Sequence, residues 1–254
     1  MLDSTPTQHL VALLQATPPQ RAVGALLAMP HARIDRLLAV MDVRLLGRML
    51  LAADPDRRAE LLSHLDDGRV AAELGLLPMA EAAVVLAALP VERAGAQLDR
   101  FAAQQLAILL DVLPDPQRHR LIDAMDPVHR ADLHRVGFER SVVASLRRTS
   151  VNLSWVPDDH ESNLFAGIMH RLVGIALCYL DGGDLPAAAV ASAQRTFATR
   201  QVHGVLLVTN ATPSLEAATL AQEARFAGLP ALLVTWTPED NDGVLARALT
   251  RLAG

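Results

Sequence analysis

Four consecutive residues, Asp158, Asp159, His160 and Glu161, form an acidic cluster that contains a histidine. Carboxylate and imidazole groups are ligands for divalent cations, and a bound cation would be able to activate water for hydrolysis. Consecutive side chains seldom all face one point, so a solvated polar loop is the alternative. The cluster is a candidate metal site, with Mg²⁺ as the first ion to test. The sequence predicts no resident cofactor.

A second polar group, Asn210, Thr212 and Ser214, follows an apolar segment at 203–210 that we expect to be a central β-strand. Ligands of open α/β sheets bind at the carboxyl ends of such strands, and helix N-termini favour anions. These three residues are therefore candidate ligand-binding residues. For Thr212 the favoured interpretation is that it is the N-cap of the next helix.

Several other chemistries are excluded by residue type. All 23 basic residues are arginine, so the chain has no P-loop lysine, Schiff-base lysine or lysine general base. Arginine is no substitute as a base, because it stays protonated. Cys178, the only cysteine, has apolar neighbours that predict a buried strand thiol and no nucleophile. We assign no catalytic residue, and the sequence favours a non-enzymatic protein.

The first half of the chain is built from about ten 12-residue units that start at Ala16. The third position of each unit is Pro or Asp in nine of ten cases: Pro18, Pro30, Asp42, Asp54, Asp66, Pro78, Pro90, Ala102, Pro114 and Asp126. The eleventh position is Leu26, Leu38, Leu50, Leu62, Leu74, Leu86, Leu98, Leu110, Ile122 and His134. Pro and Asp start helices, and a leucine at a fixed place in each helix predicts one buried face.

Each unit leaves room for about eight helical residues, or about 12 Å of helix. A helix that short is unstable alone, so its leucine face must be buried against neighbouring units. In Asp54-Pro55, Asp115-Pro116 and Asp126-Pro127 we expect the aspartate to cap the helix that the proline begins. The sequence predicts a right-handed superhelix of about ten short helices.

The starts LPVER (89–93) and ADPDRR (53–58) resemble those of the intracellular N-domain of MgtE-type magnesium transporters. A more distant resemblance is to the helical domains of the flagellar motor-switch protein. The similarity covers about residues 16–135 and implies the fold. The transporters continue into regulatory and membrane domains that are not seen here, so it implies neither magnesium transport nor any metal ligand.

Five arginines, Arg21, Arg33, Arg57, Arg69 and Arg93, share the sixth position of their units. In a solenoid one position makes one stripe, so these residues are candidates for docking an acidic partner. A solvated face balanced by nearby acids is the alternative. His129 and Asp132, three residues apart, are interpreted as surface polar residues and not as a metal site.

The second half changes to a pattern of strands and helices. We expect strands at 151–156, 164–171, 172–180, 203–210 and 229–236, and helices at 186–200, from Thr212 to about 226, and at 243–254. This alternation predicts an α/β domain with a mixed, mostly parallel sheet, whose first strands form a hairpin or meander. The predicted organisation is an N-terminal segment (1–15), the solenoid (16–136), a connecting helix (137–150) and the α/β domain (151–254).

The segment from Gly204 to Val234 resembles, weakly, the C-terminal part of Mrr-type restriction-endonuclease-like domains. That family holds Mg²⁺ with an Asp on one strand and a Glu/Gln-x-Lys on the next. The segments 164–171 and 174–180 contain no Asp, Glu or Lys. The resemblance therefore implies an inactive nuclease-like domain.

The leading hypothesis is an adaptor or regulator that binds a partner protein. The alternatives are a nucleic-acid-associated protein that binds without cleaving, and a metal-responsive enzyme that uses residues 158–161. The net charge of −5 opposes nucleic-acid binding. The sequence contains no signal peptide or membrane-spanning run, so we expect a cytoplasmic protein without membrane insertion. It leaves the oligomeric state open.

Overall fold

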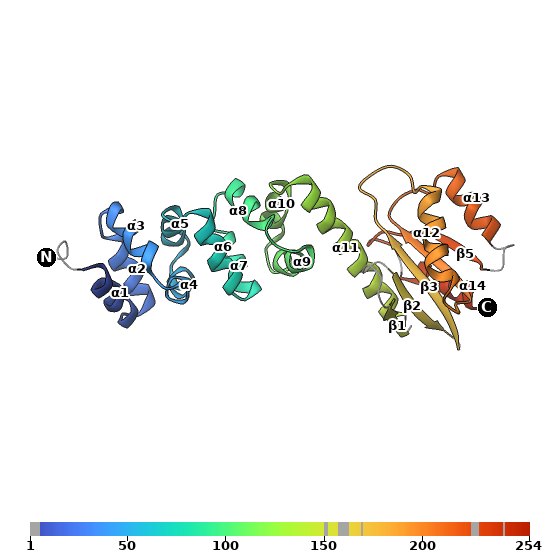
Figure 1. Ribbon diagram of the computed structural model, residues 1–254, viewed down its shortest axis with the longest axis horizontal. Helices are drawn as coiled ribbons and strands as arrows, with labels where there is room; N and C mark the ends of the chain where they lie inside the picture. Colours follow the sequence, from blue (N-terminus) through green and yellow to red (C-terminus); the bar gives the residue numbers. More distant parts are fainter. Residues whose placement is uncertain (1–5, 150–151, 157–162, 169, 225–228, 241) are drawn as a thin grey trace. The chain divides into compact units, whose positions relative to one another are not determined.

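The computed structural model describes residues 6–149, 152–156, 163–168, 170–224, 229–240 and 242–254. The chain divides into two compact units, Met1–Leu133 and His134–Gly254. The first unit is helical and the second is an α/β unit, as the sequence predicts (Figure 1). Each is described by itself below.

The helical unit is a run of short helices that ends with the first residues of a longer one. The helices are α1 (Thr7–Ala16), α2 (Pro19–Leu27), α3 (His31–Val40), α4 (Val43–Ala52), α5 (Pro55–Ser63), α6 (Asp67–Leu76), α7 (Met79–Leu86), α8 (Val91–Leu98), α9 (Ala103–Asp111), α10 (Asp115–Asp123) and α11 (Pro127–Arg148). Two features were not expected. A helix, α1, precedes the ten units, and the tenth unit continues without a break into the segment predicted as a separate connecting helix.

The helix starts follow the repeated Pro or Asp. Asp42, Asp54 and Asp66 are N-caps whose carboxylates accept a hydrogen bond from a backbone N–H of the first turn. The prediction for Asp115 is wrong, because Pro114 is the N-cap of α10 and Asp115 is its first helical residue. Ala102, the one departure from the Pro/Asp rule, caps α9 without any side-chain hydrogen bond.

The eleventh position of the repeat is the centre of the core. Its eight leucines from Leu26 to Leu110 are at most 2% exposed. Helices two apart in the chain pack together, so α2, α4, α6, α8 and α10 form one row, and α7 packs on α9 in the other. Burial of one leucine per helix against two neighbours stabilises helices that would not form alone.

The α/β unit contains a five-stranded sheet. Its elements after α11 are β1 (Asn152–Trp155), β2 (Asn163–Ile168), β3 (Arg171–Cys178), α12 (Ala187–Ala198), β4 (Gly204–Thr209), α13 (Leu215–Ala224), β5 (Ala231–Thr235) and α14 (Gly243–Ala253). The strand order is β1-β2-β3-β4-β5. β1, β2 and β3 pair antiparallel, and β3, β4 and β5 pair parallel. This confirms the predicted mixed sheet and its initial meander.

Helices cover both faces of this sheet. Leu206 and Val208 of β4 lie in a core shared with α11 and α14, while Val205 and Leu207 lie in a core shared with α12 and α13. Alternate residues of one strand thus enter opposite cores, which is why all six residues of β4 are buried. The carboxyl ends of β3 and β4 are the place where a ligand site of this fold would be expected.

Candidate functional site

The five arginines of the predicted docking stripe lie in different environments. Arg21 and Arg57 are exposed, Arg33 is buried, and Arg69 and Arg93 are half-buried. Arg69 donates a hydrogen bond to the carbonyl oxygen of Met41, 28 residues earlier. Arg93 repeats this relation by donating to the carbonyl of Leu65, also 28 residues earlier.

Arg93 makes two further contacts. Its Nη1 donates to the carbonyl oxygen of Leu62 at 2.7 Å, and its Nε donates to Asp67 at 2.6 Å. Leu62 lies in the last turn of α5 and Leu65 follows the end of that helix, where carbonyl groups lack the i+4 N–H partner of a helix interior. Arg69 and Arg93 therefore hold a neighbouring helix end in place, and only Arg21 and Arg57 have the exposure that a docking stripe needs.

Glu73, on the inner face of α6, is only 1% exposed. Its Oε1 lies 3.4 Å from Nε of Arg69, one helical turn earlier. Burial raises the pKa of Glu73 to about 7, although the charge of Arg69 acts in the opposite direction and Asp42 adds to the rise. The carboxyl group can therefore change its protonation state near neutral pH.

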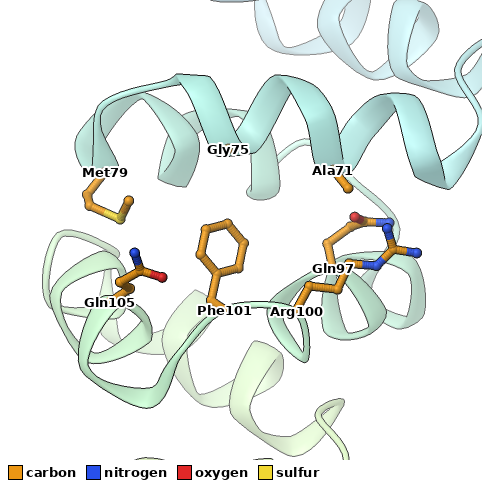
Figure 2. A pocket seen from close by; sticks show the side chains of 7 residues that line it. All are labelled: Ala71, Gly75, Met79, Gln97, Arg100, Phe101 and Gln105. Atoms are coloured by element: carbon orange, nitrogen blue, oxygen red, sulfur yellow. The ribbon is translucent and has the colours of Figure 1, made fainter.

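Gln97 occupies the equivalent place on α8, 24 residues later, and is also 1% exposed. Neither its Nε2 nor its Oε1 has a hydrogen-bond partner among the described residues. The side chain lines a pocket of about 210 Å³ together with Ala71, Gly75, Met79, Arg100, Phe101 and Gln105. Figure 2 shows Gln97 and Arg100 at one end of this pocket, Met79 and Gln105 at the other, and the Phe101 ring between them. We call it the Gln97 pocket.

A second hollow lies on the same unit and is mostly apolar. It has a volume of about 280 Å³ and is lined by Ala80, Ala83, Val84 and Ala87 of α7 and its C-terminal turn, by Val112 and Leu113 before α10, and by Pro55 and Arg58 of α5. Val84 is 40% exposed and Val112 is 52% exposed. We call it the alanine groove. Its small side chains leave room for apolar groups of another chain.

Histidines of the helical unit form one unpredicted cluster. Nε2 of His64 lies 3.3 Å from Nδ1 of His31, and Nδ1 of His64 lies 2.7 Å from Oδ1 of Asp35. His129 lies 3.8 Å from Asp126 and 3.9 Å from Asp99. Among the residues that the structure describes, no three His, Cys, Asp or Glu side chains are grouped so as to hold a metal ion.

In the α/β unit the candidate ligand residues take part in local hydrogen bonding. The Asn210 amide accepts from the backbone N–H of Leu180 and donates to the Leu180 carbonyl, both at 2.8 Å. The backbone carbonyl of Thr212 accepts from the N–H of Leu185. Ser214, and not Thr212, caps α13, because its hydroxyl accepts the N–H of Ala217 at 3.1 Å. Asn210 thereby joins the ends of β3 and β4.

The remaining candidates of this unit carry little chemistry in the structure. Asp158, Asp159, His160 and Glu161 lie outside the described residues. Cys178 is half-buried at the end of β3, and burial raises the pKa of its thiol, so the reactive thiolate is disfavoured.

No helix in the described part of the chain has the length and apolar character to span a membrane.

The sequence contains a signal for Glu73 and Gln97. Both occupy the tenth position of the 12-residue unit. The other members of that position are Ala25, Leu37, Met49, Leu61, Val85, Leu109, Leu121 and Leu133, and all except Ala25 are buried. Two polar residues in an otherwise apolar, buried column mark places where the solenoid departs from simple packing.

Comparison with known protein families matches the N-terminal part of the chain. The family model of the MgtE intracellular N domain matches residues 1–89, which contain α1 to α7. This supports the resemblance in the N-terminal part and includes α1, which precedes the ten 12-residue units. No curated protein and no solved structure matches the chain. The nuclease-like resemblance of the second half therefore stays a prediction.

Proposed function

We propose that the chain is a non-enzymatic adaptor or regulator whose helical unit binds a partner protein in the alanine groove. The observation that carries this proposal is the exposure of Val84 and Val112 side by side with the small residues of α7. Covering apolar side chains in a hollow removes them from water, and this stabilises the complex with a partner. The occupant that fits is an apolar segment of another protein.

The architecture supports the same function. A solenoid buries its core through neighbouring units and leaves one long surface free, which is the form that repeat proteins use for protein contacts. The MgtE N-domain that residues 1–89 match is itself a helical domain. Arg21 and Arg57 enter the proposal as secondary contacts for acidic residues of the partner, because both side chains are exposed.

For the α/β unit we propose a role without catalysis. β2 and β3 contain no Asp, Glu or Lys, whereas Mg²⁺-dependent cleavage needs carboxylates on adjacent strands. Asn210 hydrogen-bonds the backbone of Leu180, so its amide supports the sheet. The unit would then serve as a second, inactive docking or enzyme-like module.

A site-specific photo-crosslinker at Val112, introduced into the full chain in its native cells, tests the proposal. The control position is Val40, which is 60% exposed at the end of α3 and does not line the groove. We expect an adduct with one partner protein from position 112 and none from position 40. The double change Val84→Glu and Val112→Glu should abolish that partner's association.

Three outcomes would count against the proposal. Equal adducts from both positions would mean that contact is non-specific. No adduct from either would leave the groove without a partner. An adduct of twice the 27.3 kDa chain mass would mean that a second copy covers the groove.

A further inference from the structure

The amide of Gln97 is the feature of the Gln97 pocket that needs a chemical explanation. It is 1% exposed, and both its donor and its acceptor lack a partner within the described residues. Buried amides are almost always hydrogen-bonded, because an unpaired donor or acceptor loses its contacts with water. A group that enters the pocket and offers both an acceptor and a donor would satisfy this side chain.

Arg100 adds a positive charge at the same end of the pocket. Its side chain is exposed, and no carboxylate of the described chain forms an ion pair with it. Most other arginines near the core are engaged, as Arg69 and Arg93 are by backbone carbonyls. A free guanidinium beside a donor amide favours a carboxylate, which accepts two parallel hydrogen bonds.

Away from Gln97 and Arg100, the pocket is lined by the apolar residues Phe101 and Met79 and by one further amide, Gln105. The ring of Phe101 forms its middle and Met79 its far end (Figure 2). Phe101 is the only aromatic residue before position 138. The volume of about 210 Å³ equals about seven waters' share of liquid. The pocket therefore admits one residue-sized group with an apolar side chain.

The pocket also lies where the repeat is altered. Gln97 replaces an apolar residue of the tenth position, and Ala102, at the start of α9, replaces the usual Pro or Asp. Gln97 lines the cavity, and Ala102 directly follows the lining residue Phe101 in the chain. Arg100 and Phe101 belong to the turn between them.

We infer that the Gln97 pocket binds the terminal carboxylate of an amino-acid unit. Arg100 and the Gln97 Nε2 donate to the carboxylate, the Gln97 Oε1 accepts from the adjacent N–H of the ligand, and an apolar side chain lies against Phe101 and Met79. The ligand is the C-terminal residue of a polypeptide or a free amino acid, which share this chemistry. The site goes beyond the docking function, because Val84 and Val112 do not line it.

The test is a titration of the full chain with N-acetyl-L-leucine and with N-acetyl-L-leucinamide, which differ only in the terminal carboxylate. Binding is followed by the NMR signals of the Gln97 side-chain NH₂ group. We expect the acid to shift these signals with a millimolar Kd, as befits so small a ligand. N-acetyl-L-leucinamide should bind at least about tenfold more weakly, because it cannot form the charge-assisted hydrogen bond with Arg100.

Matched variants show whether the named residues carry the binding. Arg100→Gln should weaken binding of N-acetyl-L-leucine by about tenfold or more. Arg48→Gln, at an exposed arginine of α4, should leave that binding unchanged. Gln97→Met restores the apolar residue type of the tenth position and should abolish binding while the chain stays folded. Since this variant lacks the Gln97 NH₂ group, its binding is followed by the backbone NMR signals of Phe101. Val112→Glu should have no effect on binding in the Gln97 pocket. A failure of the docking proposal is therefore distinguishable from a failure of this inference.

Equal binding of acid and amide, undiminished binding by Arg100→Gln or Gln97→Met, or no response to any ligand at millimolar concentration would each overturn the inference. Free L-leucine distinguishes the two sources. Binding as tight as that of the acetylated form points to a free amino acid, and weaker binding points to the end of a polypeptide. Both results support the shared chemistry.

Discussion

Glu73 and Gln97 occupy the same position of two equivalent repeats, yet their surroundings differ. Both are 1% exposed and lie on helices of the same row, α6 and α8. Glu73 has Arg69 four residues earlier and within 3.4 Å. Gln97 also has an arginine four residues earlier, but Arg93 is engaged by Leu62, Leu65 and Asp67.

The difference shows what a buried polar residue needs in a solenoid core. A carboxylate left without a counter-charge would cost several kcal/mol, so Glu73 is matched by Arg69 and by its own raised pKa. A neutral amide costs less, so Gln97 persists without a partner in the described chain. The first arrangement is an ion pair at 3.4 Å whose two buried atoms make no hydrogen bond within the described residues, and the second lines a pocket that a ligand can enter.

The largest expected effect concerns the glycines at the eighth position of two repeats. A Cβ on Gly95 would lie 2.4 Å from the carbonyl oxygen of Ala124, whereas one on Gly47 would meet only Glu73 and Leu77 at 3.5 Å. Gly95→Ala should therefore destabilise the chain by about 3 kcal/mol. Gly47→Ala is the control and should stay within about 1 kcal/mol of wild type, because contact is normal and alanine favours helix. Urea denaturation measures both, and equal effects would contradict the close approach of α8 to Ala124.

Next in size is the pH dependence that Glu73 should impose. Its pKa is about 7 in the folded chain against an ordinary value of 4.5, so the folded state binds the proton more tightly. The contribution of Glu73 to stability is thus fully present below pH 4.5 and is lost as the pH rises to about 7. The loss should be on the order of 3 kcal/mol.

Denaturation at pH 5 and pH 7.5 measures this loss. Glu73→Gln makes the α6 site resemble the α8 site and should reduce the difference between the two pH values by the same amount. Gln97→Glu should add a new loss of the same sign, because Arg93 is already engaged. If Glu73→Gln leaves the pH dependence unchanged, the assignment to Glu73 is wrong.

Removing the counter-charge of Glu73 should have a smaller effect. Arg69→Met takes away the ion pair and the hydrogen bond to Met41, and we expect a loss of about 2 kcal/mol at pH 7.5. At pH 5 the loss should shrink, since Glu73 is then protonated. Arg48→Met, on the exposed side of α4, is the control. The same loss at both pH values would show that the Met41 hydrogen bond alone matters.

The sequence was sufficient for the repeat and for the order of strands and helices, because both rest on local rules. Pro, Asp and leucine at fixed spacing determine where the short helices begin and which face they bury. The sequence was insufficient to predict the candidate sites, because these depend on contacts between residues that lie 24 to 28 positions apart in the chain. Arg69 and Arg93 looked like members of a stripe, but their guanidinium groups reach carbonyls 28 residues away.

The same limit applied to Asn210. The end of β4 predicts a ligand site in a parallel sheet, but the amide is used by the backbone of Leu180 on the neighbouring strand segment. Register between strands decides this, and register is not written in either segment alone. The polar residues at the tenth position were visible in the sequence. Their opposite roles followed only from the partners that packing gives them.

The smallest effect, and the one that tests the comparison most directly, is a gain of stability. Gln97→Met replaces a buried amide without partners by an apolar side chain of similar length, the residue type found at Met49 in the same position. We expect a gain of about 1 kcal/mol in the free energy of unfolding, because the unpaired donor and acceptor are removed. Glu73→Met should lack this gain at pH 5, where Glu73 is protonated, and show it only at pH 7.5. If Gln97→Met instead lowers stability at both pH values, the amide has partners in the folded chain and the contrast between the two repeats disappears.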